Sequence, residues 1–104
     1  MARARRQVIW AVRASQMLDD AVGYVAQDSP SAARRLLVEA LDAAESLATL
    51  SERGRRVPEL DISITREILV GRYRLIYEVH RNQVFILAFL HGSRDFESWR
   101  IQNF

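Results

Sequence analysis

The 104-residue sequence predicts an α+β domain in which a helical hairpin packs on one small, antiparallel-rich β-sheet. Two observations lead to this prediction. A short apolar run precedes two segments with apolar residues at helical spacing, and three runs rich in β-branched and aromatic residues follow them. The expected order of elements is therefore β-α-α-β-β-β. Because a chain of this length is expected to form one domain, residues 1–104 are predicted to fold as a single unit.

The first half of the chain contains the predicted leading strand and both predicted helices. The apolar run within residues 7–13 predicts a short, buried strand. Ser15 has a side chain suited to an N-cap, which places the first helix at residues 16–27. Pro30 suits the first position of a helix because its missing N–H would be unpaired there, and the apolar periodicity extends this second helix over residues 30–50. The short connection between the helices makes them antiparallel neighbours.

The second half contains three predicted strands, at residues 64–70, 72–79 and 83–90. Turns are expected near Gly71 and at residues 81–82. The middle strand carries charged residues on one face, whereas the last strand is apolar on both faces. We therefore expect the last strand to lie in the interior of the sheet.

The basic residues are concentrated in the predicted sheet and in the loop that leads into it. All fifteen are arginine, and seven of them lie between residues 53 and 81 against four acidic residues. Arginine keeps its charge when half buried and offers a planar fork to carboxylates and phosphates. The net charge is a modest +2, so this distribution indicates an acidic or anionic partner, or a buried carboxylate.

The composition excludes several kinds of site. The sequence has no cysteine, so disulfides and thiolate metal sites are absent. No apolar stretch approaches ~18 residues, the length needed to span a membrane. The apolar segment near the N-terminus is too short for a signal peptide. We therefore expect a cytoplasmic protein with no membrane partner, no metal and no cofactor.

Four segments follow one another in a specific order along the chain. They are S-P-S-A-A-R-R at the corner of the predicted hairpin, G-R-R-V-P-E after it, R-E-I-L-V-G-R-Y-R-L-I-Y-E-V in the predicted sheet, and H-G-S-R-D beyond the last strand. In order and spacing they resemble the RelE/ParE superfamily of bacterial toxins from type II toxin–antitoxin systems, over residues 7–95. The resemblance implies a toxin, linked to plasmid stabilisation, that a cognate antitoxin neutralises. The antitoxin segment is expected to lie across the groove between helices and sheet and to supply acidic and apolar side chains.

The resemblance implies two alternative activities. ParE-like members inhibit DNA gyrase by direct binding, whereas RelE-like members cut messenger RNA in the ribosomal A site. Cleavage by a 2′-hydroxyl needs a general base, a general acid and cations that stabilise the developing phosphorane charge. As a nuclease, this chain would use Glu59 as the base and His91 as the acid, with Arg66, Arg74 and Arg94 on the phosphate.

Two departures from the nuclease pattern favour the gyrase alternative. Thr65 and Glu67 stand where RelE has lysines, and Trp99 and Arg100 stand near the position of a catalytic tyrosine. We therefore expect a ParE-like toxin with no catalytic residues of its own, and the ribosome-dependent endoribonuclease remains the alternative. The residues expected to contact a protein partner are Arg66, Arg72, Arg74, Arg94 and Trp99.

Structural roles compete with these functional ones in the sheet. Arg74 is expected either to pair with Glu67 or Glu78 across the sheet, or to contact an acidic segment of the antitoxin. His91 precedes a glycine, and its alternative role is that of a turn histidine bonded to the backbone.

The loop and the C-terminal tail also leave alternatives open. Glu59 is either the base of a nuclease or a loop carboxylate paired with Arg55 or Arg56. The tail at residues 96–104 is expected to pack on the sheet as a partial turn of helix, or to stay mobile until a partner covers it.

Overall fold

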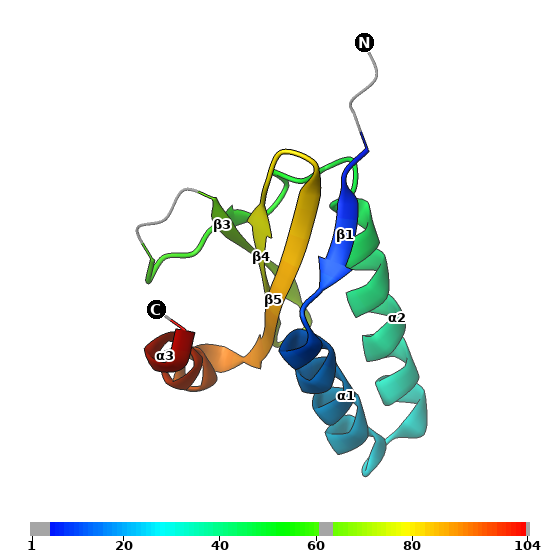
Figure 1. Cartoon of the computed structure of the whole chain (residues 1–104). Coiled ribbons are helices and arrows are strands. Elements are labelled where there is room, and N and C mark those ends of the chain that lie inside the picture. Colours follow the sequence, from blue (N-terminus) through cyan, green and yellow to red (C-terminus); the bar gives the residue numbers. More distant parts are fainter. Residues whose placement is uncertain (1–4, 61–63, 104) are drawn as a thin grey trace.

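The computed structural model describes residues 5–60 and 64–103, apart from the side chains of Ser93 and Arg94 (Figure 1). The strands are β1 (Gln7–Trp10), β2 (Arg55–Arg56), β3 (Thr65–Val70), β4 (Tyr73–Val79) and β5 (Gln83–His91), and the helices are α1 (Val12–Ala26), α2 (Pro30–Ser46) and α3 (Gly92–Asn103). Among these described helices, none is long and apolar enough to cross a membrane.

Within the described residues, the strands form one five-stranded sheet in the order β1-β5-β4-β3-β2. The pairing of β1 with β5 is parallel, and the other pairs are antiparallel. The α1–α2 hairpin lies on one face of this sheet and α3 on the other (Figure 1). The predicted α+β fold is therefore confirmed, and β5 occupies the interior position that its apolar sequence predicts.

The first helix begins earlier than predicted, at Val12, because β1 ends at Trp10. The backbone N–H of Ala11 donates to the carbonyl of Ile86 at 2.9 Å, and the chain turns into the helix directly after this ladder bond. Ala11 stands at the N-cap position without a side-chain cap, and Ser15 lies inside the helix. The predicted cap at Ser15 was wrong, because the strand pairing of the preceding residues decides where the helix begins.

The second helix begins at Pro30, as predicted. The hydroxyl of Ser29 accepts a hydrogen bond from the backbone N–H of Ala32 at 3.1 Å, which caps the first turn. The helix ends at Ser46 rather than near residue 50, and the Ser46 hydroxyl donates to the carbonyl of Ala43 at 2.6 Å. This bond back to the preceding turn competes with a regular continuation of the helix.

Apolar side chains bury both faces of the sheet. On the hairpin face the core contains Leu18, Leu36, Tyr77, Ile86 and Phe89. On the opposite face α3 supplies Phe96 and Trp99 to a second cluster with Val57, Ile76 and Ala88. The C-terminal tail therefore forms a helix that packs on the sheet, which decides between the two alternatives left open for it.

An irregularity in the pairing of β4 with β5 sets which β5 side chains reach each face. Ile76 pairs with Ala88 whereas Tyr77 pairs with Ile86, so Leu87 is an extra residue in β5. Such a bulge reverses the alternation of the side chains that follow it. The end of β5 is thereby re-aimed before the chain enters α3.

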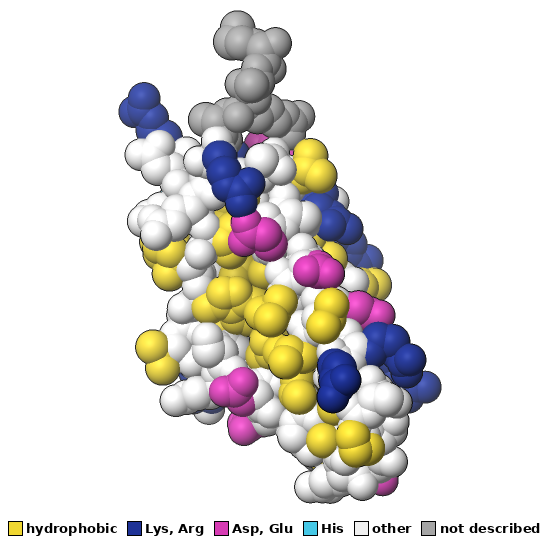
Figure 2. Space-filling view, turned by 90° about the vertical axis from the view of Figure 1, so that its right-hand side faces the viewer, with side chains coloured by type: hydrophobic (Ala, Val, Ile, Leu, Met, Phe, Trp, Pro, Cys, Tyr) yellow, Lys and Arg dark blue, Asp and Glu magenta, His cyan; other side chains and the backbone are white. Residues whose placement is uncertain are grey.

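The outward side of the hairpin is not uniformly polar. Figure 2 shows hydrophobic side chains gathered in the middle of one face of the molecule, with arginines and acidic residues around them. On α2, Val38 and Leu41 are half exposed. This helix therefore presents apolar groups to solvent as well as to the sheet.

Candidate functional site

A buried ion pair lies on the α3 face of the sheet. The side chain of Glu67 on β3 is fully buried, and that of Arg74 on β4 is 8% exposed. Arg74 donates from Nε and Nη2 to Oε1 of Glu67, at 3.0 and 2.5 Å. Arg55 on β2 donates from Nε to the other oxygen, Oε2, at 2.8 Å. Both oxygens of the buried carboxylate are thus bound by arginines, as a buried charge requires.

The guanidinium of Arg74 also binds a second carboxylate. Its Nη1 and Nη2 donate to Oε2 and Oε1 of Glu59, at 2.9 and 2.7 Å, in a two-pronged fork. The guanidinium carbon lies 4.4 Å from the centre of the Phe96 ring of α3. Arg55, Glu59, Glu67 and Arg74 form what we call the arginine–glutamate cluster, and their formal charges cancel.

Glu59 is a weak base in this setting. Its hydrogen bonds with Arg74 hold the pKa of the Glu59 carboxyl below its ordinary value, while burial opposes this shift. The same hydrogen bonds raise the pKa of Arg74. Glu59 therefore pairs with Arg74. Within the described residues, neither Arg55 nor Arg56, the partners expected for a loop carboxylate, donates a hydrogen bond to it.

The lowered pKa of Glu59 makes an acid-sensitivity prediction. Its contribution to stability is fully present above about pH 4.5, the ordinary pKa of the carboxyl, and is lost as the pH falls through the lower pKa of the folded state. We expect Glu59→Gln to melt at a lower temperature than the wild type at pH 7, and the two melting temperatures to converge in acid. Thermal unfolding followed by circular dichroism between pH 3 and 7 measures this, with Glu39→Gln on the exposed surface of α2 as the control. Parallel curves for the wild type and Glu59→Gln would contradict it.

The remaining nuclease candidates are not brought to this cluster. Side chains alternate along β3, so Arg66 lies on the hairpin face of the sheet, where its Nη1 donates to the carbonyl of Gly54 at 2.8 Å. His91 packs edge-on against Tyr73, with ring centres 5.0 Å apart, on the side of the sheet opposite Arg74. The side chain of Arg94 lies outside the described part of the chain. The structure thus unites Glu59 and Arg74 and separates Arg66 and His91 from them.

The open alternatives for Arg74 are narrowed by these contacts. Of the two expected carboxylate partners, Glu67 binds Arg74, whereas Oε1 of Glu78 is hydrogen-bonded to Nε2 of His80 at 3.0 Å. In the described residues, no group of three or more acidic or histidine side chains is arranged to hold a metal ion.

A cleft of about 410 Å³ opens beside the cluster, at the turn between β3 and β4. Its charged lining residues are Arg55, Glu59, Arg72 and Arg74. Arg72 is exposed next to Gly71, which adopts the left-handed backbone conformation of a tight turn. Two exposed arginines, Arg55 and Arg72, thus line this cleft together with the buried Arg74, and we call it the arginine cleft.

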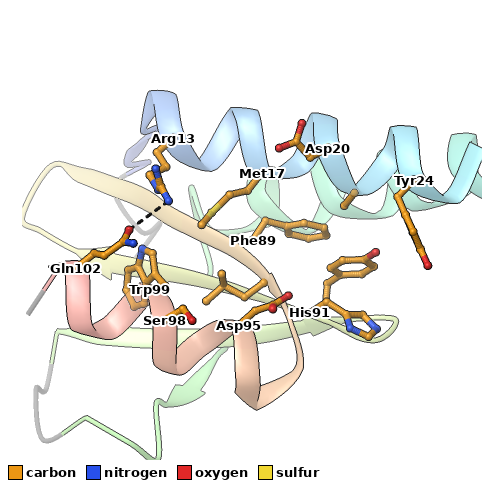
Figure 3. Close-up of a pocket in the computed structure, with 13 residues that line it drawn as sticks. Arg13, Met17, Asp20, Tyr24, Phe89, His91, Asp95, Ser98, Trp99 and Gln102 are labelled. Atoms are coloured by element: carbon orange, nitrogen blue, oxygen red, sulfur yellow. Dashed lines mark hydrogen bonds between the residues drawn. The ribbon is translucent and has the colours of Figure 1, made fainter.

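A second hollow, of about 510 Å³, lies between α1 and α3 and is called here the α1–α3 groove (Figure 3). The aromatic residues that line it are Tyr24, Tyr73, Phe89 and Trp99, and the acidic ones are Asp20 and Asp95. The rings of Tyr73 and Phe89 are stacked, with their centres 4.8 Å apart. At one end, Nη2 of Arg13 donates to Oε1 of Gln102 at 3.3 Å and links the two helices (Figure 3).

Sequence reasoning missed this groove for a structural reason. Its two walls come from helices that are far apart in the sequence, and one of them was predicted only as a partial turn. The aromatic residues of the tail were the available signal, because an aromatic residue such as Trp99 in a short amphipathic tail indicates packing against a neighbouring element.

Comparison with known proteins places this chain among the toxins of the RelE/ParE superfamily. The family described as "ParE toxin of type II toxin-antitoxin system, parDE" matches residues 8–96. The chain belongs to this family, which confirms the predicted superfamily. It is therefore the toxin of a type II toxin–antitoxin system, with a cognate antitoxin as its partner.

Individual proteins agree with this assignment. Toxin RelE2 of Caulobacter vibrioides is 37% identical over 89 residues, which cover 85% of this chain and 97% of that protein. Y4kP of Sinorhizobium fredii is 30% identical over 93 residues, covering 88% and 93%. A solved structure described as "Chromosomal ParDE TA system from P. aeruginosa" superposes with a TM-score of 0.70 over 86% of this chain and 99% of the other. At 16% identity, this last likeness shows a shared fold.

Proposed function

We propose that this toxin inhibits DNA gyrase by binding it directly, in the bacterial cytoplasm, and that the antitoxin blocks this binding. The observation that supports it best is the neutral arginine–glutamate cluster. Arg74 is one of the three arginines that a nuclease would direct at the scissile phosphate, yet it donates to Glu59 and Glu67. A guanidinium already neutralised by two carboxylates gives little stabilisation to a developing phosphorane charge.

The distribution of the other candidates also supports a binding role. Arg66 and His91 lie on the hairpin side, so a single RNA phosphate near Arg74 would not meet all of them. Glu59 has a lowered pKa, and a general base works best when its pKa is near the working pH. A surface that binds a protein requires neither the convergence of these side chains on one phosphate nor a general base with a suitable pKa.

The proposed partner contacts fall into two groups. Arg72 is exposed beside the cleft and would contact gyrase or the antitoxin directly, as would Arg66 and Arg94. Arg74 and Trp99 are buried, so they would act by holding this surface in shape. A planar arginine fork suits acidic side chains of a protein partner.

A supercoiling assay tests the proposal. Purified toxin added to gyrase, relaxed DNA and ATP should block supercoiling or trap cleaved DNA. Prior addition of the antitoxin should restore supercoiling. Unimpaired supercoiling at toxin concentrations that arrest growth would overturn the proposal.

A second candidate function is ribosome-dependent cleavage of messenger RNA. It is favoured by the 37% identity to a protein named RelE2. In this case Glu59 would act as the base, and Glu59→Gln should lower the cleavage rate by roughly 10²–10⁴-fold. The assay is primer extension on a ribosome-bound message. Gln102→Ala, at the far end of the α1–α3 groove, serves as the control expected to cleave normally.

A further inference from the structure

We propose that the α1–α3 groove binds an arginine or lysine side chain, flanked by apolar residues, from a segment of the cognate antitoxin. The inference rests on the toxin–antitoxin function and is independent of whether gyrase or messenger RNA is the target. It differs from the acidic segment expected from the sequence, because this groove has the opposite charge to the arginine cleft.

The shape and lining of the groove suit an extended cationic side chain. Figure 3 shows α1 and α3 on its two sides, with Phe89 between them. Tyr24 on α1 is 70% exposed, so much of its ring is accessible to a partner that enters the groove. The aliphatic stem of arginine or lysine packs on apolar surface while its head stays polar, and the faces of aromatic rings attract the head.

The charge of the groove is negative on a protein that is positive overall. Asp20 on α1 and Asp95 on α3 contribute two negative charges, and Arg13 contributes one positive charge that is engaged with Gln102. With His91, which also lines the groove, counted as neutral, the lining carries a formal −1, whereas the whole chain counted in the same way carries +2. A cation that enters would meet carboxylates from both walls.

The negative charge of the groove also affects Tyr73, which lines it. The pKa of Tyr73 is raised, first by burial and then by neighbouring groups that include Tyr24 and Asp95. A negative carboxylate that disfavours the tyrosinate favours a nearby cation for the same reason. Leu90 and Met17 add apolar surface next to it, which accounts for the apolar residues expected on either side of the cation.

The first test uses two synthetic peptides and the intact toxin. The probes are acetyl-Ala-Leu-Arg-Leu-Ala-amide and the same peptide with citrulline, a neutral isostere, in place of arginine. In ¹⁵N-labelled toxin we expect the arginine peptide to shift the Trp99 indole and the Tyr24 and Asp95 amide signals, and to bind roughly tenfold more tightly than the citrulline peptide. Equal binding of the two peptides, or shifts confined to other surfaces, would overturn the proposal.

The second test uses the natural complex and matched charge variants. Asp20→Asn/Asp95→Asn removes both carboxylates of the groove, and Asp19→Asn/Asp28→Asn removes two exposed carboxylates of the hairpin that do not line it. The groove variant should bind the antitoxin about tenfold more weakly and with less dependence on salt, while the control variant should bind as the wild type does. Unchanged affinity of the groove variant would overturn this inference and leave the toxin–antitoxin function intact. Absence of antitoxin binding by the wild type would instead contradict the toxin–antitoxin function.

Discussion

Replacing Arg74 with methionine should lower the free energy of unfolding by about 3–5 kcal/mol. The substitution leaves the fully buried carboxylate of Glu67 with Arg55 as its remaining partner in the cluster, and the side chain of Arg55 is 61% exposed. It also releases Glu59, which loses the fork that ties its loop to the sheet. Urea unfolding followed by tryptophan fluorescence gives the difference.

A matched substitution and a double variant complete this test. Arg81→Met, at the exposed turn between β4 and β5, should change stability by less than about 0.5 kcal/mol. The double variant Glu67→Leu/Arg74→Met should recover much of the loss, because the buried carboxylate is then gone. The two charges that lose their partners, Arg55 and Glu59, have side chains that are 61% and 32% exposed and can be solvated. If Arg74→Met unfolds at the same urea concentration as the wild type, the burial of the Glu67 carboxylate does not require Arg74.

Gly54→Ala should destabilise the protein by about 1–3 kcal/mol through crowding. A Cβ atom at this position would lie 2.5 Å from the backbone oxygen of Glu67 and 2.5 Å from Oη of Tyr77. The backbone N–H of Gly54 donates to this hydroxyl at 2.9 Å, so moving the ring away would also break a buried hydrogen bond. Thermal unfolding measures the loss.

The same substitution should have the opposite effect at Gly23. This residue lies inside α1, and a Cβ atom there would meet nothing within 4 Å. Gly23→Ala should therefore stabilise the protein by up to about 1 kcal/mol, the difference in helix propensity. Losses of equal size at Gly54 and Gly23 would contradict the crowding explanation.

Local patterns in the sequence predicted most of the regular structure. Pro30 marked the beginning of α2 correctly, because the residue type itself favours the first helical position. The ends of helices were predicted less well. Ser15 suits a cap, yet the hydrogen bond of Ala11 to β5 places the helix start earlier. A contact with a distant strand overrode a local preference.

The candidate site was predicted in part. Glu67 was one of the alternative partners expected for Arg74, beside Glu78 and an acidic antitoxin segment, and Arg74 binds Glu67 in the structure. The hydrogen-bond partner of Glu59 is Arg74, which was not among the expected partners, because Glu59 lies in a loop and no periodicity relates a loop residue to a strand.

The sequence by itself determined the fold class, the second helix, the interior place of β5 and the superfamily, because these follow from local periodicity, turn residues and the order of motifs. The tertiary structure alone decided which charges meet. The fork between Glu59 and Arg74, the extra residue Leu87 and the α1–α3 groove all depend on how separate elements pack. Packing and strand register are set by the whole chain, so no single segment encodes them.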